Sequence, residues 1–567
     1  MTARLQLLRL ARRLWRPLPL PLRLALSSPA GWLRERLLRH RHWHYRDWMA
    51  AVEPRPEHRA AMRAHLESLG VAELPLRAVL DARQAAPKAV QASLDSLAAQ
   101  WLPWAAPIVW REGPLSACLA GQQAGGLITV LRAGDRLAPS AGYFLRLAVQ
   151  RRPATRLWLS DEDRMVDGRR AEPLFHGQFD PLQYWAGAQL PGVVSLRWDE
   201  STAGPVAQAS EWPPLLAVVI AQCEPEQIGH VDSVLLHRAQ PAPPPHLPPL
   251  PAGLEREAGP AAPVLRATLP GAAPLVSILI PTRNGEHLVR QCLASIAERA
   301  PHNRCRVEIL LIDNGSDCER ARAYFSTCEA AGELRCIRVD APFNYSALNN
   351  IAAEQARGEL LLLLNNDIEV RTLDWLDRMA GFALRPEVGC VGAKLYYPDG
   401  RIQHAGVITG LGRLAGHAHR FAAADSAGYG GRLLRPQQLS AVTAACLMVR
   451  RETYAAVGGL DAEHLAVAFN DVDFCLRVRE QGLRNVWLPD VELVHHESVS
   501  RGADDNPEKA ERFAREAAYL QRRWRTDERT DPAYSVHLCH EGEDFGLNRW
   551  PRPQRPWLGQ PAPPRAL

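Results

Sequence analysis

The sequence predicts an α/β protein of two tandem domains, each with a mostly parallel sheet and helices on both faces. Short apolar, β-branched runs alternate with helix-periodic segments, which is typical of this class. A proline-dense segment divides the chain, and similar segments recur in the same order on either side of it. At 567 residues the chain is long enough for two or three domains, each with its own core.

Composition excludes several other classes. The eleven cysteines form no CxxC pair, which argues for a reducing compartment and against a disulfide framework. The net charge of +5 is too modest to indicate a nucleic-acid partner. No apolar run reaches the roughly 18–20 residues that a membrane span needs. We therefore expect a cytoplasmic protein that does not bind nucleic acid.

Prolines and charges set the expected domain boundaries. Residues 239–274 are dense in proline, so they cannot hold a helix or a central strand and predict a semi-rigid linker. The linker separates a first domain, 70–238, from a second domain, 275–540, and a Pro-rich tail follows at 541–567. Residues 1–50 form a basic arm, with eleven arginines and only Glu35 as an acid among residues 1–46. Helical spacing of Leu and Arg over Leu5–Trp15 suits peripheral contact with an anionic membrane face; a poorly ordered tail is the alternative.

The two halves resemble diverged copies of one unit. The matching segments, whose offset grows along the chain, are Leu80–Arg83 with Ile280–Arg283, 126–135 with 358–367, 167–169 with 399–401, and 228–237 with 486–495. Longer insertions in the second copy explain the growing offset.

In the second half, predicted strands end in polar turns. The run 276–280 is stopped by Pro281, the run 307–312 ends at Asp313, and the run 360–364 ends at Asn365-Asn366-Asp367. Between the first two runs, 286–298 has helical periodicity. Ligands of such sheets bind beyond the carboxyl ends of the strands, where these turns lie.

The acidic turns indicate a ligand chemistry. A diphosphate joining a nucleoside to a sugar needs a hard cation such as Mg²⁺ or Mn²⁺, held by one or two carboxylates. Asp367 suits that task, and Asp313 could accept hydrogen bonds from the base or ribose. For each, the alternative is an ordinary turn aspartate.

Two further segments carry candidate chemistry. Asn470-Asp471-Val472-Asp473 begins a predicted helix, where a carboxylate could act as general base or merely cap the helix. Further on, His495 could complete a metal site and Arg501 could neutralise a departing diphosphate. The alternative for the histidine is a structural role.

With these motifs in place, the second half resembles the inverting family 2 glycosyltransferases with a GT-A fold, especially the rhamnosyltransferase-like enzymes of O-antigen and surface-polysaccharide assembly. The motifs that carry the resemblance are Ile280-Pro-Thr-Arg-Asn284, Ile312-Asp-Asn-Gly-Ser-Asp317, Phe343-Asn-Tyr-Ser346 with Asn349-Asn350, Leu364-Asn-Asn-Asp367, Gln403-His-Ala-Gly406, Gly416-His-Ala-His419, Asn470-Asp-Val-Asp473 and His495-His-Glu-Ser498.

The resemblance implies a role for each matching position. Asp367 takes the metal-ligand place of the family's DxD motif, His495 reaches the metal or the diphosphate, and Asp471 is the catalytic base. The implied donor-binding residues are Pro281, Thr282, Asn284, Asp313, Asn344, Asn349, Asn365, Asn366 and Arg501, and the implied acceptor-binding residues are His404, Asn470 and Asp473. Two departures are Cys318 in place of an acid and Ala444-Ala445-Cys446 in place of a glycine-containing acceptor loop.

The resemblance also implies a reaction. An acceptor hydroxyl attacks the anomeric carbon of a dTDP- or UDP-sugar, with rhamnose as the expected sugar, a divalent metal (Mg²⁺ or Mn²⁺) as cofactor and a lipid-linked saccharide as acceptor. The first half resembles the same GT-A fold in degenerate form. Its DxD position has become Arg132-Ala-Gly-Asp135, the base segment has become Glu211-Trp-Pro-Pro, and the acids of Ser160–Asp163 are interpreted as remnants.

Three alternatives stay open at this stage. A nucleotidyltransferase would need a basic, Gly-rich triphosphate loop, which Pro281–Asn284 is not. A bifunctional enzyme would need carboxylates that the first half has mostly lost. A non-catalytic saccharide-binding scaffold would not need Asp313, Asp367, Asp471 and His495 together.

Overall fold

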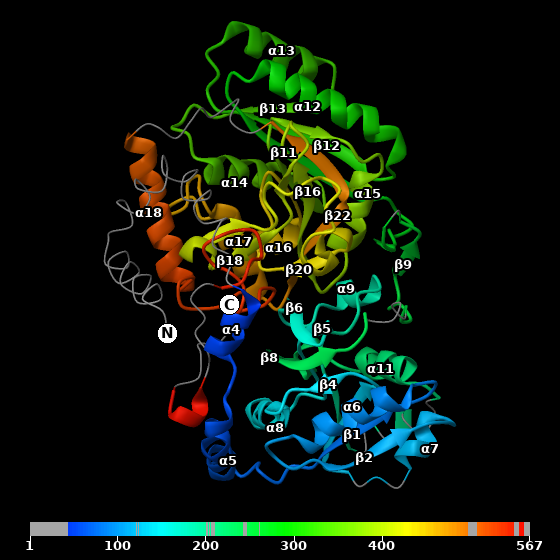
Figure 1. The fold of residues 1–567 in the computed structure, drawn as a ribbon. Helices are drawn as coiled ribbons and strands as arrows, with labels where there is room; N and C mark the ends of the chain where they lie inside the picture. The colour runs from blue at the N-terminus through cyan, green and yellow to red at the C-terminus, as the bar shows by residue number, and fades with distance from the viewer. Residues whose placement is uncertain are drawn as a thin grey trace.

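The computed structural model describes residues 44–560, apart from 121, 123, 200–201, 203, 206–209, 242–246, 260, 497–506 and 549–554. The predicted amphipathic segment Leu5–Trp15 and Arg501 lie outside the described residues. Figure 1 shows two sheet-bearing domains in succession, the first in blue to cyan and the second in green to orange. This confirms the predicted α/β architecture. No helix in the described part of the chain has the length and apolar character to cross a membrane.

The first domain is built on an eight-stranded sheet in the order β2-β1-β3-β7-β5-β8-β4, with β6 paired to β5. Its strands are β1 (Leu76–Asp81), β2 (Ala105–Trp110), β3 (Gly126–Arg132), β4 (Arg136–Leu137), β5 (Leu157–Val166), β6 (Arg169–Leu174), β7 (Val194–Trp198) and β8 (Ile228–Arg238). Its helices, with those that precede it, are α4 (Tyr45–Val52), α5 (Arg59–Ser68), α6 (Pro87–Ala98), α7 (Leu115–Leu119), α8 (Ala141–Arg151), α9 (Pro181–Trp185) and α11 (Trp212–Ala221).

The second domain is built on a ten-stranded sheet in the order β13-β12-β11-β14-β21-β16-β22-β15, with β17 paired to β16 and β20 to β22. Its strands are β11 (Leu275–Thr282), β12 (Arg306–Asp313), β13 (Arg335–Arg338), β14 (Leu360–Leu364), β15 (Ile368–Val370), β16 (Val388–Tyr396), β17 (Ile402–His404), β20 (Gln437–Leu439), β21 (Cys446–Arg450) and β22 (Arg484–His495), and β18 (Val407–Thr409) with β19 (Ala415–His417) forms a separate ribbon. Its helices are α12 (Glu286–Arg299), α13 (Glu319–Ala330), α14 (Tyr345–Gln355), α15 (Trp375–Ala383), α16 (Arg451–Ala456), α17 (Asn470–Glu480) and α18 (Pro507–Trp524).

Both sheets are mixed, which corrects the expectation of mostly parallel sheets. Strands β13, β12, β11 and β14 run parallel, but β21 is antiparallel to both of its neighbours, β14 and β16. The regular β-α alternation from which a parallel sheet was inferred ends at β14. After it, several strands follow one another without an intervening helix, so successive strands need not run parallel.

The two sheets nevertheless share one topology. If β1 is matched to β11, β2 to β12, β3 to β14, β7 to β21, β5 to β16, β8 to β22 and β4 to β15, the strand orders coincide. Parallel and antiparallel pairs fall at the same places in both orders, and β6 pairs with β5 as β17 pairs with β16. The repeated sequence segments therefore lie on matching strands.

Two local features add detail to the predicted organisation. The Pro-rich linker holds a two-stranded ribbon, β9 (Leu254–Glu257) with β10 (Val264–Ala267), which is anchored by Arg266 to Asp374 of the second domain. Helix α11 begins directly after Glu211, with two prolines in its first turn. The first turn of a helix has N–H groups without an intrahelical acceptor, so proline is tolerated there.

The domains contact each other through residues 175–180 of the first domain and three segments of the second. The backbone N–H of Phe175 donates to the Tyr429 hydroxyl over 2.7 Å, and the N–H of Gln178 donates to the carbonyl of Pro532 over 2.7 Å. The Asp180 carboxylate accepts from the backbone N–H of Gln438 over 2.8 Å. The first domain therefore packs directly on segments that follow β19 in the second domain.

Candidate active site

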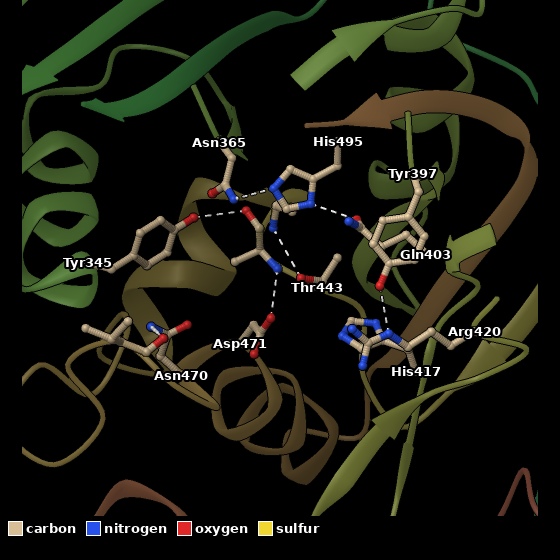
Figure 2. Close-up of a pocket in the computed structure, with 13 residues that line it drawn as sticks. Tyr345, Asn365, Tyr397, Gln403, His417, Arg420, Thr443, Asn470, Asp471 and His495 are labelled. Carbon is tan, nitrogen blue, oxygen red and sulfur yellow. Dashed lines mark hydrogen bonds between the residues drawn. The ribbon is translucent and has the colours of Figure 1, made fainter. Parts of the chain in front are cut away.

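A polar pocket of about 240 Å³ opens at the end of β14 in the second domain, between α14, α17 and the loops around β17, β19 and β21. Its walls are drawn in Figure 2. The lining residues are Tyr345, Asn365, Tyr397, Gln403, His417, Arg420, Thr443, Ala444, Ala445, Val467, Asn470, Asp471 and His495. Four of the predicted site residues (Asn365, Asn470, Asp471 and His495) are among them.

Asp471 is fixed in this wall by backbone donors. Its carboxylate accepts from the N–H of Ala444 over 3.0 Å and from its neighbour Val472 over 2.8 Å. Burial raises the pKa of the Asp471 carboxyl above its ordinary value, although these hydrogen bonds oppose the shift. A carboxylate that is oriented and has a raised pKa suits proton abstraction near neutral pH.

Opposite Asp471, a chain of polar contacts orients His495. The Oε1 atom of Gln403 can only accept, so Nδ1 of His495 donates to it over 2.7 Å. The Nε2 atom then carries the lone pair, and it lies 3.1 Å from Nδ2 of Asn365 and 3.1 Å from Oδ1 of Asp367 (Figure 2 shows the first of these). Asp367 and His495 are neighbours because Ile368 of β15 pairs directly with His495 of β22.

This donor set fits a divalent cation. The described residues hold no cluster of three or more Cys, His, Asp or Glu side chains arranged for a metal. A carboxylate and an imidazole are nevertheless enough protein ligands for Mg²⁺ or Mn²⁺ when substrate phosphates supply the rest. Asp367 and His495 are the residues that would hold it.

The predicted nucleoside-binding residues gather on an adjoining edge, at the ends of β11 and β12. Asn366 donates to the Thr282 hydroxyl over 2.9 Å, and Asn284 accepts from the backbone N–H of Asp317 over 3.0 Å. Asp313 accepts from the N–H of Ser316 over 2.8 Å, and its other oxygen accepts from Arg338 over 2.9 Å. The residue pair Thr282 and Asp313 is in direct register between the two strands, while Pro281 lies one position earlier in β11.

Three other predicted residues make structural hydrogen bonds and do not line the pocket. Asn344 caps α14, and Asn349 is fully buried and donates to the Tyr345 carbonyl. Asp473 is fully buried; it accepts from Trp524 of α18 and from Arg477. None of the three lines the pocket: Asn344 and Asn349 bond to backbone groups of α14, and Asp473 joins α17 to α18, so their predicted contact with substrate stays a prediction.

His404 is also displaced from its predicted role. Its ring is fully buried behind the pocket wall, where its Nδ1 lies 2.7 Å from Nδ1 of His417. Burial lowers the pKa of both rings, aided at His404 by the imidazoles of His417 and His495. The pKa of His417 falls to about 4, because Arg420 and His495 add to the effect of burial. His417, not His404, faces the pocket, so His404 positions its partner.

Sequence reasoning missed most of the other wall residues, namely Tyr345, Tyr397, Gln403, His417, Arg420 and Thr443. Tyr345, Gln403 and His417 lie inside the motifs that carried the resemblance, so those motifs could have pointed to them. Tyr397 and Arg420 lie in loops with no chemical spacing pattern. They meet because the Arg420 guanidinium donates to the Tyr397 hydroxyl over 2.8 Å.

A buried histidine beside this wall makes stability depend on pH. The Nε2 atom of His419 accepts from the N–H of Tyr429, and burial lowers the pKa of His419 to about 3. Below its unfolded pKa of about 6.5, the unfolded chain binds the proton and the folded chain does not, so the free energy of unfolding falls by about 1.4 kcal/mol per pH unit. Between pH 6.5 and pH 5 we expect the free energy of unfolding to fall by about 2 kcal/mol less in His419→Gln than in the unchanged chain. Urea unfolding at the two pH values measures this; an unchanged loss in the variant would contradict it.

An α/β domain with a polar pocket beyond the carboxyl ends of its parallel strands is typical of enzymes that bind nucleotides or phosphorylated ligands. Residues 277–457 match the family described as Glycosyl transferase family 2, so the second half carries a glycosyltransferase domain of that family.

Three relatives extend this comparison. The chain is 40% identical over 457 residues to the uncharacterized protein y4gI of Sinorhizobium fredii, covering 75% of this chain and 50% of that one. It is 33% identical over 467 residues to the O-antigen biosynthesis protein RfbC of Myxococcus xanthus, covering 75% of this chain and 35% of that protein. It is 27% identical over 244 residues to the N-acetylglucosaminyl-diphospho-decaprenol L-rhamnosyltransferase of Mycobacterium tuberculosis, covering 39% and 75% of the two chains. The chain thus spans half or less of the length of the first two relatives.

Proposed function

We propose that this protein transfers a sugar, with inversion, from a nucleoside diphospho-sugar to a hydroxyl of a saccharide acceptor. The observation that carries the proposal is the pocket in which the Asp471 carboxylate lies across from His495 and Asn365, with Asp367 beside His495. One wall thus offers a base, and the other offers ligands for a diphosphate and its cation.

The chemistry follows from the two walls. The acceptor hydroxyl gives its proton to Asp471 as its oxygen forms a bond to the anomeric carbon, and the bond from that carbon to the diphosphate oxygen breaks. The bonding pair leaves with the nucleoside diphosphate. The N–H groups of Ala444 and Val472 hold the carboxylate in place throughout. No covalent enzyme intermediate is needed, so a single displacement inverts the anomeric centre.

A divalent cation, when bound, would neutralise the charge that develops on the diphosphate. Asp367 and His495 would hold it, and Gln403 keeps the His495 lone pair directed toward Asp367. Thr282, Asn284 and Asp313 would receive the nucleoside on the adjoining edge. Arg501 lies outside the described residues and stays a candidate for the diphosphate.

The relatives support a narrower assignment of substrates. The mycobacterial relative is named for rhamnosyl transfer to a diphospho-decaprenol-linked N-acetylglucosamine, and the myxobacterial relative for O-antigen biosynthesis. We therefore infer dTDP-rhamnose as the donor, a lipid-linked saccharide as the acceptor, and surface polysaccharide synthesis in the cytoplasm as the setting.

A binding panel followed by a transfer assay tests this proposal. The purified chain would be heated with dTDP, UDP, GDP or ATP, with and without Mn²⁺. It would then be incubated with dTDP-rhamnose and N-acetylglucosaminyl-diphospho-polyprenol. Metal-dependent stabilisation by dTDP and a product of inverted configuration are expected. Stabilisation by UDP or GDP instead would change the donor, and no stabilisation by any nucleotide would favour the saccharide-binding scaffold.

Arg420 and Tyr397 line the pocket on the opposite side of Figure 2 from Asn365, and we place the acceptor there. Replacing Arg420 by alanine removes the donor to the Tyr397 hydroxyl and a cation of the wall. We expect the acceptor KM to rise about tenfold, the loss of a charge-assisted hydrogen bond, with the donor KM unchanged. Steady-state kinetics with each substrate varied would show this split, and Arg63→Ala on the exposed face of α5 is the control. A rise in donor KM alone would move Arg420 to the donor side.

A further inference from the structure

The shared topology lets each pocket residue of the second domain be matched to a position in the first. In the second sheet, Ile368 of β15 pairs with His495 of β22; in the first, Arg136 of β4 pairs with His237 of β8. His237 therefore occupies the position of His495. The residues just before the two short strands, Asp135 and Asp367, correspond in the same way.

Two more positions follow from the hairpins beside these strands. In the first sheet, Asp163 of β5 pairs with His237. In the second sheet, Tyr396 of β16 pairs with Val494, so the next residue, Tyr397, lies at the level of His495. Asp163 thus corresponds to Tyr397. Likewise Glu162 pairs with Leu174 and Tyr396 pairs with Ile402, so the next residues, Phe175 and Gln403, correspond.

Helix α4 covers these matched positions. The Tyr45 hydroxyl donates to Asp163 over 2.7 Å, and the Trp48 ring centroid lies 4.8 Å from that of Phe175. Arg170 bridges Asp163, over 2.7 Å, and Glu53, the residue that follows α4. The side chain of Asp163 is fully buried and Trp48 is 1% exposed, so α4 fills this site. In Figure 1 the helix lies beside β6, between the two domains.

The polar groups at the matched positions form hydrogen bonds and ion pairs with other residues of the first domain. His237 Nδ1 contacts Asp163 over 2.7 Å, and Asp135 accepts from the backbone N–H of Ala239 over 2.9 Å. At the end of β1, where the second domain has its nucleoside edge, Arg83 lies over the Trp110 ring and pairs with Glu211 at the start of α11 over 3.0 Å. These contacts occupy the edges that receive substrate in the second domain.

We propose that the first domain is a closed copy of the catalytic domain, and that the site corresponding to the pocket has become the docking socket of helix α4. The occupant is a segment of the same chain, residues 45–53. Three contacts hold the segment in the socket: Tyr45 with Asp163, Trp48 with Phe175, and Glu53 with Arg170. The protein therefore has one nucleotide site per chain. Asp163 serves docking, whereas Asp161 and Glu162 accept from the backbone N–H groups of His176 and Gly192.

Hydrogen exchange and binding stoichiometry on the full chain test this proposal. We expect slow hydrogen exchange in residues 45–52. The double variant Tyr45→Phe, Asp163→Asn should accelerate this exchange at least tenfold. The control Tyr519→Phe removes a tyrosine hydroxyl that donates to Asp461 instead, and it should leave the exchange unchanged. Titration with dTDP and Mn²⁺ should give one site, lost in Asp367→Asn and kept in Asp135→Asn.

The possible results separate this inference from the proposed function. Two nucleotide sites, or rapid exchange of residues 45–52 in the unchanged chain, would overturn the closed copy and favour a bifunctional enzyme. Protected α4 with no nucleotide bound at all would support the socket while refuting the proposed donor. Tyr45→Phe and Asp163→Asn are both nearly isosteric, so we expect the double variant to fold. Its thermal midpoint would show whether the first domain has merely unfolded.

Discussion

Replacing Asp471 by asparagine is expected to lower kcat for sugar transfer by about 10²–10⁴-fold, the usual contribution of a positioned general base. Asparagine keeps the size of the side chain and can still accept from the backbone N–H of Ala444. It cannot take the proton of the acceptor hydroxyl. Nucleotide binding should therefore persist while turnover is lost, which initial rates at saturating donor and acceptor, together with dTDP titration, would measure.

Asp473 offers a matched control two residues along the same helix. Its carboxylate is fully buried and accepts from Trp524 and Arg477, so Asp473→Asn should lower the thermal midpoint yet leave kcat of the folded enzyme nearly unchanged. If Asp473→Asn abolished turnover in a folded protein and Asp471→Asn did not, the assignment of the base would be reversed.

The pH profile of the unchanged enzyme bears on the same residue. Only the ionised carboxylate can accept a proton, so kcat should fall as pH falls through the pKa of Asp471. Since burial raises that pKa, the fall should begin at higher pH than for an ordinary aspartate. A profile that stays flat down to the ordinary pKa of aspartate, about 4, would exclude Asp471 as the group whose ionisation controls turnover.

The sequence was most informative where local pattern and burial coincide. The five leucines of β14 are fully buried and pair with β11 on one side and β21 on the other, as a continuous apolar run predicts. The polar turns that end β11, β12 and β14 lie on adjoining edges because these strands are parallel. The nucleoside edge and the Asp367 turn could therefore be predicted from sequence order alone.

It was least informative where partners come from far along the chain. Asp471 and Asp473 lie in one motif, and only the packing of Trp524 from α18 separates a pocket residue from a buried one. The same limit applies to α4, whose sequence suggested part of a basic arm. Its burial depends on Asp163 and Phe175, more than a hundred residues away, and no local periodicity reports such contacts.

Replacing Asp367 by asparagine is expected to abolish Mn²⁺-dependent stabilisation by dTDP and to lower kcat/KM by about 10²–10³-fold, the scale of losing a preorganised electrostatic contact to a developing charge. The amide keeps an oxygen near His495 but removes the charge that a hard cation prefers. His495→Gln, which leaves the carboxylate, should weaken Mn²⁺ binding less.

The matched control is Asp399→Asn in an exposed turn, where the carboxylate pairs with Arg401 over 2.7 Å, and this variant should behave as the unchanged chain. Thermal unfolding with increasing Mn²⁺ at fixed dTDP would rank the three variants. Equal Mn²⁺ dependence in Asp367→Asn and Asp399→Asn would mean that the cation binds elsewhere, and the pocket would then have to neutralise the diphosphate with its own side chains.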